Sequence, residues 1–406
     1  MDNTPCLRVS QCHTQLLRKT LQSKGLLDPT LCLLKDSDET ILLPLLASCL
    51  SGLDLQSLKA IVAPESICEI VWNQSPLPSK KSKRWTLGNK LQQNLQELVE
   101  SHGEGWTEEL KGDLPHSFHR HGDVILLGDS CFSMPLWGKM DAQQLWSVVA
   151  KVFGAKRLAK MSQISRNGFR SPAVTMLYGE NSWVRHVDNG IVYEFDVTKC
   201  MFSAGNITEK LRVAGFDCRG ETVVDLYAGI GYFTLPYLVH AQAGHVHACE
   251  WNPDATEALQ KNLVVNGVSD RCTVHQGDNR KLQLCDIADR VNLGLIPRSE
   301  DGWPVACRLL RKATGGILHI HQNVTSPLPD TTAVPANVDA TGRVSRKTAD
   351  REVWRLWADD TARCIASLLK DTTGAVWITS IQHIQHVKSY APHVHHIVLD
   401  LDCRPS

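Results

Sequence analysis

One run of the sequence, Val223 to Phe233, constrains the fold more than any other. Its first residues are apolar and end in Asp225, and a turn containing Gly229 and Gly231 then leads into a helix-like pattern. A buried strand, a glycine turn and a helix in this order are typical of the ligand-binding edge of a parallel α/β sheet. The run therefore predicts a doubly wound, mainly parallel sheet with a ligand at the turn.

The sequence after this run alternates between strand-like and helix-like patterns, which supports an α/β sheet. Further strands are predicted at Val246–Glu250, Cys272–His275, Arg290–Leu293, Gly316–His321, Ala375–Ile381 and His396–Leu401. Helices are predicted at Phe233–Val239, Trp303–Arg311 and Arg351–Leu369, and another from Asn252-Pro253 to Asn266-Gly267. In the last of these, Asn is a favourable N-cap, Pro suits the first helical position and Gly suits the C-terminal end. Thr325–Ser345 is polar and predicts a loop.

The upstream part is harder to assign. A helix is predicted at Leu87–Ser101, and short strands at Asp123–Leu127, Val174–Leu177, Trp183–His186 and Ile191–Phe195. Ser75–Arg84 carries prolines, serines and cations, which favours a linker. We therefore expect an N-terminal α+β region at 1–145, a strand-rich segment at 146–215 and the sheet domain at 216–406.

The glycine turn differs from the dinucleotide fingerprint. That fingerprint requires a third glycine, and the corresponding residue here is Thr234. Gly229 and Gly231 still allow a tight turn and a close approach of the backbone to a ligand. A ligand without a pyrophosphate, such as S-adenosylmethionine, is therefore favoured over a dinucleotide.

Polar residues follow the first three strands of the predicted sheet. Asp225 ends the first strand, and Glu250, at the end of the second, can accept hydrogen bonds from ribose hydroxyls. Asp278 and Asn279 follow the third strand, where an acceptor suits the adenine amino group and a backbone N–H suits a ring nitrogen. The pattern predicts an S-adenosylmethionine-dependent transferase. The alternative is an ordinary α/β domain in which these residues bind nothing.

From about Arg157 onward the sequence resembles the tRNA position-37 enzymes of eukaryotes and archaea. These comprise a guanine-N1 methyltransferase and a wybutosine-synthesis aminocarboxypropyltransferase. The run Phe195–Arg212 is similar to the segment before the catalytic core of both, and Cys249–Pro253 and Gly277–Arg280 match their second and third motifs. The resemblance implies a class I methyltransferase-like fold: a mainly parallel seven-stranded sheet with an antiparallel C-terminal strand, after a smaller α+β region.

Cofactor contacts at Ser203 and Lys210 are also implied by this resemblance. Before about residue 115 the similarity is much lower, so a tRNA-recruiting role for that region rests on analogy.

The segment after the fourth strand separates the two relatives. The methyltransferase has Asn-Leu-Pro there, whereas this chain has Gly294-Leu295-Ile296-Pro297 after Leu293, followed by Gly302-Trp303. This stretch and Lys388–His393 resemble the aminocarboxypropyltransferase. The resemblance implies transfer of the 3-amino-3-carboxypropyl group of S-adenosylmethionine to C7 of 4-demethylwyosine at position 37 of phenylalanine tRNA.

A carbon acceptor must lose a proton, and two residues are candidates for assisting this step. Asp278 is a candidate base, although its predicted adenine contact competes, and Asn292 is a candidate for orienting the reactants. Two other functions remain open: guanine-37 N1-methylation, and a non-catalytic tRNA-binding protein that retains the fold.

Binding of tRNA must come from local clusters, because the 43 Lys+Arg balance the 43 Asp+Glu. The best candidate is the acid-free stretch from 151 to 170, with Lys151, Lys156, Arg157, Lys160, Arg166 and Arg170. A solvated charged face is the equally plain alternative. The cations of Lys80–Arg84 are interpreted as part of the linker.

The remaining features exclude several classes of protein. No run is apolar and long enough to span a membrane, and no signal peptide is expected. The 14 cysteines form no Cys-x-x-Cys pair, which favours reduced thiols in the cytoplasm and argues against zinc. Histidines gather near the C-terminus and in His245–His247 and His319–His321, but their spacing matches no metal site. The oligomeric state is not fixed by the sequence.

Overall fold

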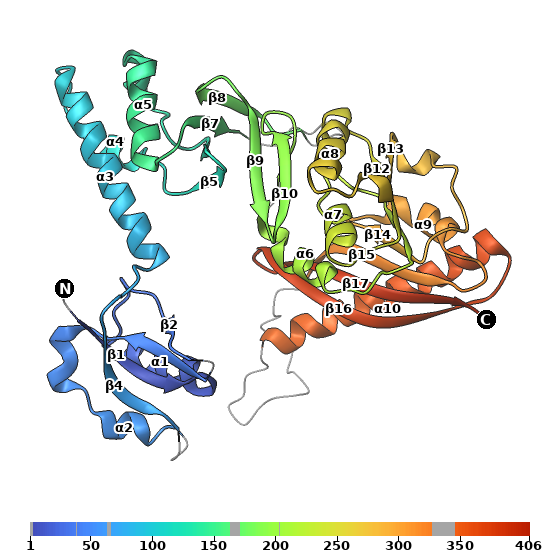
Figure 1. Ribbon diagram of the computed structural model, residues 1–406, viewed down its shortest axis with the longest axis horizontal. Helices are drawn as coiled ribbons and strands as arrows, with labels where there is room; N and C mark the ends of the chain where they lie inside the picture. Colours follow the sequence, from blue (N-terminus) through green and yellow to red (C-terminus); the bar gives the residue numbers. More distant parts are fainter. Residues whose placement is uncertain (1–2, 38, 63–65, 163–170, 203, 327–345) are drawn as a thin grey trace, which may run out of the picture. The chain divides into compact units, whose positions relative to one another are not determined.

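The computed structural model describes residues 3–37, 39–62, 66–162, 171–202, 204–326 and 346–406. They form two compact units, residues 1–117 with 130–155, and residues 118–129 with 156–406. Each unit has buried hydrophobic residues of its own, and Figure 1 labels the helices and strands of both units. The three-part division at residues 145 and 215 stays a prediction.

The first unit contains an antiparallel four-stranded sheet with the strand order β2-β3-β1-β4. Buried leucines of its strands and of α1 form the core, among them Leu7, Leu17, Leu21 and Leu43. The elements of this unit are β1 (Thr4–Ser10), α1 (Thr14–Ser23), β2 (Leu34–Lys35), β3 (Thr40–Pro44), α2 (Leu55–Lys59), β4 (Cys68–Asn73), α3 (Lys80–Ser101), α4 (Glu108–Gly112) and α5 (Ala142–Phe153). The predicted N-terminal α+β region is confirmed by these elements.

The prediction of a linker at Ser75–Arg84 is wrong in its second half. Helix α3 begins at Lys80, because Ser79 is its N-cap and accepts a hydrogen bond from the backbone N–H of Ser82 at 3.1 Å. A serine hydroxyl in this place satisfies one of the free N–H groups of a first helical turn. The cations at 80–84 therefore belong to a helix, and the prolines at 76 and 78 lie before it.

The second unit begins with two small sheets. One is four-stranded with the order β5-β6-β7-β8, and the other is the antiparallel hairpin of β9 and β10. Their bounds are β5 (Phe118–His121), β6 (Val124–Gly128), β7 (Arg157–Met161), β8 (Val174–Tyr178), β9 (Trp183–Asp188) and β10 (Ile191–Asp196). The strands predicted in this part of the chain are confirmed. Strands β6 and β7 are parallel, and the pairs β5–β6, β7–β8 and β9–β10 are antiparallel.

The main sheet has seven strands in the order β13-β12-β11-β14-β15-β17-β16. Its strands are β11 (Thr222–Asp225), β12 (His245–Glu250), β13 (Cys272–Gln276), β14 (Arg290–Leu293), β15 (Gly316–Thr325), β16 (Trp377–Ala391) and β17 (Val394–Pro405). Its helices are α6 (Ile207–Ala214), α7 (Thr234–Val239), α8 (Pro253–Val265), α9 (Trp303–Leu309) and α10 (Arg346–Thr373). Within the described residues, β17 is the strand that runs antiparallel to its neighbours, so the predicted sheet is confirmed.

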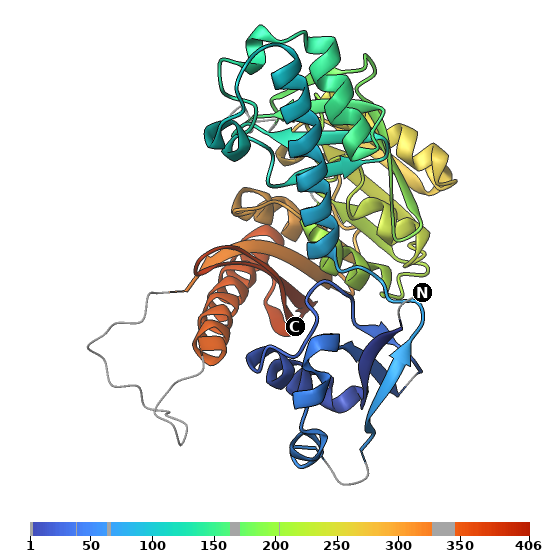
Figure 2. The same ribbon diagram turned by 90° about the vertical axis from the view of Figure 1, so that its left-hand side faces the viewer.

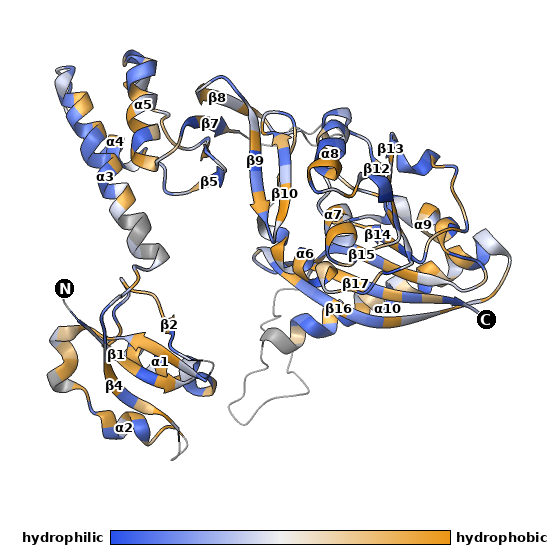
Figure 3. Cartoon of the chain, in the orientation of Figure 1, coloured by the Kyte–Doolittle hydropathy of each residue, from blue (hydrophilic) through white to orange (hydrophobic). Residues whose placement is uncertain are grey.

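Strands β16 and β17 form a long hairpin that extends well beyond the predicted strands. The sequence after Ile381 is polar, so its alternation gave no strand signal, and the pairing with β17 shifts register three times. Figure 2 shows α10 running along these strands. In Figure 3, β17 carries hydrophilic residues among hydrophobic ones.

Both faces of the main sheet are covered. Successive residues of β11 point to opposite faces, so Val223 joins a core with α6, α7 and α8, and Val224 joins another with α9 and α10. The chain order reverses on either side of β11, whose neighbours are β12 and β14. In open parallel sheets a crevice for ligands lies at this switch point, outside the carboxyl ends of the strands.

Candidate cofactor and transfer site

Asp225, at the end of β11, is completely buried and contacts residues on both sides of the glycine turn. One carboxylate oxygen accepts a hydrogen bond from the Thr234 hydroxyl at 2.8 Å, and the other accepts one from the Asn292 amide at 2.9 Å. Burial raises the pKa of Asp225, and these hydrogen bonds act in the opposite direction. Asp225 therefore lies where the sequence predicted, but its polar contacts tie three segments of the chain together.

The two glycines of the turn have positive φ angles, 56° at Gly229 and 104° at Gly231. A Cβ at Gly229 would come within 2.7 Å of the ring of Tyr232, and one at Gly231 would come within 3.0 Å of Leu235. The Tyr232 hydroxyl in turn donates to the carbonyl of Met201 in the segment before α6. Both the conformation and the space thus require glycine.

Glu250 ends β12 and accepts hydrogen bonds from the turns that follow β11 and β12. One carboxylate oxygen accepts the backbone N–H of Gly229 and the other accepts that of Asn252, each at 2.7 Å. Burial raises the pKa of Glu250, and these backbone hydrogen bonds oppose the rise. Each oxygen keeps a second lone pair. The carboxylate is thus fixed in orientation and can still accept hydrogen bonds from a ribose.

Asp278 and Asn279 follow β13, as predicted. Asp278 caps a short helix, Asn279–Lys281, and the guanidinium of Arg280 lies 2.8 to 3.1 Å from its carboxylate oxygens. The hydrogen bonds from Arg280 lower the pKa of Asp278. Asn279 donates to the carbonyl of Leu226 at 2.7 Å, which joins the third strand end to the first. A carboxylate stabilised in this way is a poor proton acceptor.

Asn262 of α8 and Asn266, the C-cap residue of this helix, bind the backbone of the β9–β10 hairpin. Asn266 exchanges two hydrogen bonds with the backbone of Val192, at 3.0 and 2.7 Å. Asn262, completely buried, accepts the N–H of Glu194 at 2.6 Å and donates to the carbonyl of Ile230 inside the glycine turn at 2.9 Å. Sequence analysis did not identify this pair, because both residues look like ordinary polar positions of a helix.

Lys210 is buried in α6 and is held by the protein itself. Its ammonium forms an ion pair with Asp188 and lies 5.1 Å from the ring centres of both Tyr193 and Phe202. Its implied cofactor contact stays a prediction. Ser203, the other residue implied by resemblance, lies outside the described residues.

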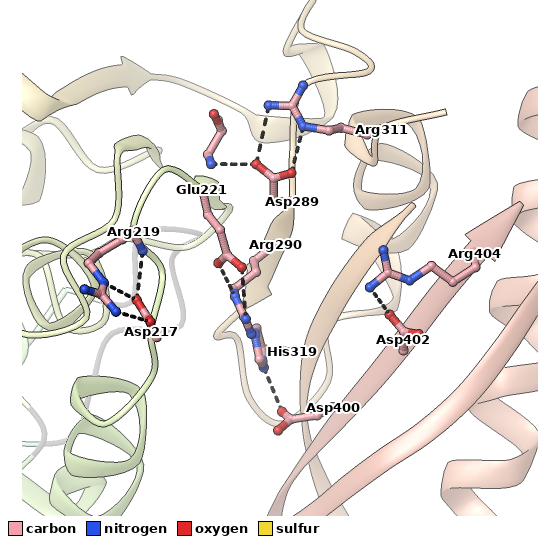
Figure 4. A network of polar contacts seen from close by, with 11 residues as sticks. Asp217, Arg219, Glu221, Asp289, Arg290, Arg311, His319, Asp400, Asp402 and Arg404 are labelled. Atoms are coloured by element: carbon pink, nitrogen blue, oxygen red, sulfur yellow. Dashed lines mark hydrogen bonds and ion pairs between the residues drawn. The ribbon is translucent and has the colours of Figure 1, made fainter. Parts of the chain in front are cut away.

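A network of buried charges extends from α6 across the main sheet. Arg212 pairs with Glu209 on its own helix and with Asp400 on β17, and His319 lies 2.7 Å from the same Asp400 carboxylate. Figure 4 shows the continuation through Arg290 to Glu221. Burial acts to raise the pKa of Asp400, but the hydrogen bonds and charges of His319 and Arg212 lower it overall. The network anchors the segment before β11 to the sheet.

Gly294 and Asn292, which the sequence singled out beside the fourth strand, have neighbours that the sequence did not assign to the site. A Cβ at Gly294 would come within 3.2 Å of the Phe233 ring, which lies 5.0 Å from the ring of His321 on β15. His321 contacts His396 on β17 through ring nitrogens 3.1 Å apart. The sequence placed His319 and His321 on one strand face, but their partners lie about 75 residues further on. Asn292 leaves its buried Oδ1 without a partner among the described residues.

The predicted RNA-binding residues have different surroundings. Arg157 on β7 is largely buried, where its guanidinium pairs with Asp123 and donates to the carbonyls of Asn181 and Trp183. Lys151 and Lys156 are exposed and Lys160 is half-buried. Arg166 and Arg170 lie outside the described residues. Arg157 thus supports the fold, which leaves the lysines as the better candidates for phosphate contacts.

Neither a metal site nor a membrane span is evident in the part of the chain that the structure describes. No three His, Cys, Asp or Glu side chains are arranged to hold a metal ion. No helix there has the length and apolar character needed to cross a membrane.

Three family models match the chain. The model described as the TRM5/TYW2 methyltransferase domain covers residues 184–338. Two models described as TYW2 N-terminal domains cover residues 7–82 and 95–182. Together they match most of residues 7–338, which includes parts of both units.

Relatives of known name are similar along nearly the whole chain. The tRNA wybutosine-synthesizing protein 2 homolog of Danio rerio is 56% identical, with 100% of both chains covered. The Homo sapiens homolog is 49% identical over 97% of this chain and 92% of its own.

Two solved structures are also similar. TYW2 of P. horikoshii, in complex with MeSAdo, is 28% identical, with a TM-score of 0.55 over 78% of this chain and 100% of its own. Trm5b of Pyrococcus abyssi, 21% identical with a TM-score of 0.56 over 99% of each chain, shares the fold.

Proposed function

The chain belongs to the tRNA wybutosine-synthesizing protein 2 family, and we propose that it transfers the 3-amino-3-carboxypropyl group of S-adenosylmethionine to the base at position 37 of phenylalanine tRNA. The observation that carries this proposal is the 56% identity with a wybutosine-synthesizing relative over the full length of both chains. The match spans the segment after β14 that distinguishes the two position-37 enzymes, and the relative is named for wybutosine synthesis. Guanine-N1 methylation is therefore not favoured.

The chemistry balances without a further reactant. S-adenosylmethionine supplies an electrophilic γ-carbon on a sulfonium leaving group. The acceptor carbon, C7 of 4-demethylwyosine, forms a bond to this γ-carbon, the electron pair of the broken bond stays on sulfur, and the proton of C7 passes to a base. The second product is methylthioadenosine, and the P. horikoshii relative is described in complex with MeSAdo, the same compound.

The residues of the switch point fit this donor. The fixed carboxylate of Glu250 suits the ribose, and Asp278 and Asn279 border the place for adenine. Gly294 leaves the wall beside Phe233 without a side chain, where the methyltransferase has Leu. The additional space beside this wall favours a donor conformation in which the γ-carbon, rather than the methyl group, faces the acceptor. The protein contributes by aligning the γ-carbon of the donor with the acceptor carbon and by excluding water from the site.

The proton acceptor and the RNA contacts are narrower proposals. Asp278 remains a candidate base, although its ion pair with Arg280 makes it a poor one, and Asn292 is a candidate for orienting the reactants. The tRNA-binding lysines are Lys151, Lys156 and Lys160. No disulfide joins the cysteines in the part of the chain that the structure describes, which supports action in the reducing cytoplasm.

The test uses S-adenosylmethionine labelled either in the methyl group or in the carboxyl group, with phenylalanine tRNA carrying 4-demethylwyosine. We expect the carboxyl label in tRNA and the methyl label in methylthioadenosine. Methyl label in tRNA would identify a methyltransferase instead. Absence of S-adenosylmethionine binding in equilibrium dialysis would favour a non-catalytic tRNA-binding protein.

A further inference from the structure

Three polar side chains lie side by side at the carboxyl edge of the main sheet. Asn323 on β15 pairs with His396 on β17, and His396 pairs with Lys388 on β16. Directly paired residues of neighbouring strands project from the same face of a sheet. Since Leu293, the last residue of β14, pairs with Ile320, this row lies beyond the end of the fourth strand. We call Asn323, His396, Lys388 and the adjoining His321 the polar cluster.

The polar cluster is continuous with the candidate transfer site. His396 contacts His321, His321 contacts Phe233, and Phe233 borders Gly294. On its other side the ammonium of Lys388 lies against Gly205 in the segment before α6, where a Cβ would come within 2.5 Å of the lysine nitrogen. Gly205 thus leaves the space that the end of Lys388 occupies.

The cluster has a positive charge without a matching negative one. Among the described residues, no carboxylate lies within ion-pair distance of the half-buried Lys388, and burial lowers the pKa of its ammonium. The acid of α10 in this region, Asp350, lies 3.7 Å from His395 instead. Burial, with the charge of Lys388 contributing, also lowers the pKa of His396 to about 4, so this ring is neutral and Lys388 supplies the charge.

The cluster also has unused polar atoms. Nε2 of His321, Nδ1 of His396 and Oδ1 of Asn323 are buried and have no hydrogen-bond partner within the described part of the chain. His321 and His396 are each only 1% exposed. Buried polar atoms normally have partners, so these unpaired ones indicate a place for a polar ligand. The ammonium of Lys388, which also lies 6.0 Å from the centroid of the Tyr390 ring, suits an anionic group of that ligand, and the acceptor Oδ1 of Asn323 suits a donor such as an amino group.

We propose that Lys388 binds the carboxylate of the group that is transferred, and so determines the specificity for the amino-acid end of the donor. This inference rests on the proposed function. With the ribose held at Glu250 on β12, the amino-acid arm of the donor extends past β11 toward β14 and β15. The polar cluster begins at β15 and continues onto β17 and β16. The carboxylate is the donor's one anionic group, and it stays in the same transferred group as the γ-carbon, bonded to the α-carbon two bonds away. A contact to it therefore persists through the reaction and orients the carbon that is attacked.

The test compares ligand binding by the wild-type chain and by Lys388→Met, which keeps most of the length of the side chain and removes its charge. The ligands are S-adenosylmethionine, its decarboxylated analogue and methylthioadenosine, measured by isothermal titration calorimetry. A charge-assisted hydrogen bond corresponds to a loss of about 10- to 100-fold in affinity. We expect this loss for S-adenosylmethionine alone, with the other two ligands unchanged.

Two further variants make the outcome decisive. Lys370→Met, on the exposed side of α10, is the matched control and should bind all three ligands as the wild type does. Gly205→Ala places a methyl group where the lysine nitrogen lies, and should reduce the preference for S-adenosylmethionine over its decarboxylated analogue even if Lys388→Met fails to fold.

Three results would overturn the proposal. Equal loss for all three ligands, or no loss, would exclude a carboxylate contact. Weaker tRNA binding with unchanged S-adenosylmethionine binding would assign Lys388 to a phosphate. Because binding is measured without turnover, a chain that transferred methyl groups yet lost carboxylate discrimination in Lys388→Met would refute the proposed function and leave this inference standing.

Discussion

Asn292 on β14 donates its side-chain amide to the completely buried carboxylate of Asp225 on β11, at 2.9 Å and across the switch point of the sheet. The two residues are 67 positions apart in the sequence. The hydrogen bond locks together the two strands whose carboxyl ends border the crevice. Since the other oxygen of Asp225 binds Thr234, directly after the glycine turn, the same carboxylate connects the sheet with the turn.

Asn292→Ala should therefore destabilise the protein. It leaves one oxygen of a buried carboxylate without its donor, which costs about 1 to 3 kcal/mol in the free energy of unfolding. Urea denaturation measures the change. Asn94→Ala, on the exposed face of α3, is the control and should change stability by less than about 0.5 kcal/mol. Equal effects of the two substitutions would contradict a special role for the pair.

Glu250→Ala should weaken the binding of S-adenosylmethionine by about 10- to 100-fold, because a charged acceptor for the ribose and the fixed position of Gly229 are both lost. Calorimetric titration checks this expectation. Glu257→Ala is the matched control, since this exposed residue of α8 pairs only with Lys261 at 2.7 Å in the described structure. An unchanged affinity in Glu250→Ala would show that the ribose is held elsewhere.

The second unit should lose stability as the pH falls from about 6.5 to about 4. Burial, with smaller contributions from His186 and His119, lowers the pKa of His121 to about 4, so the folded protein binds fewer protons than the unfolded chain in this window. The loss for one such histidine approaches about 3 kcal/mol.

His121→Phe should remove this part of the loss. The ring of His121 already lies against the rings of both Phe195 and Phe202, with centroids 5.6 and 5.3 Å away, so a phenyl ring suits the position. We expect the variant to be more stable than the wild type at pH 5, by denaturant unfolding. His240→Phe, at an exposed position, serves as the control. If His121→Phe kept the full pH dependence, the titration would belong to other groups.

Lys156→Ala and Arg157→Ala should separate RNA binding from folding. The loss of one phosphate contact by the exposed Lys156 should reduce the slope of log affinity against log salt concentration by about 1, with unchanged stability. Arg157→Ala removes the ion pair with Asp123 and should cost about 1 to 3 kcal/mol of stability. Filter binding over a salt series and thermal unfolding measure the two effects. Identical behaviour of both variants would contradict the assignment.

Local chemistry explains which elements could be predicted from the sequence. Asn252 caps α8, Pro253 begins it and Gly267 follows it with a φ of 69°, and all three signals lie within the helix or beside it. The start of α3 was missed because the capping serine at 79 stands among prolines that favour a linker.

The contacts of the site are less predictable because they join distant segments. Asp225 and Glu250 lie where the strand pattern placed them, but nothing in their neighbourhood indicates Asn292 or the backbone of Gly229 as partners. The contact of Lys388 with Gly205 depends on a long hairpin whose polar sequence showed no strand pattern.

The ion pair between Arg212 and Asp400 spans 188 residues of sequence. Contacts between such distant residues form late, because a long loop must close before they add any stability. Helix α6 also packs against α7 and pairs Lys210 with Asp188, so these contacts need no residue of β17. The ion pair to Asp400, in contrast, cannot form until β17 has been synthesised and has joined the sheet, so the charge network around α6 is completed only then.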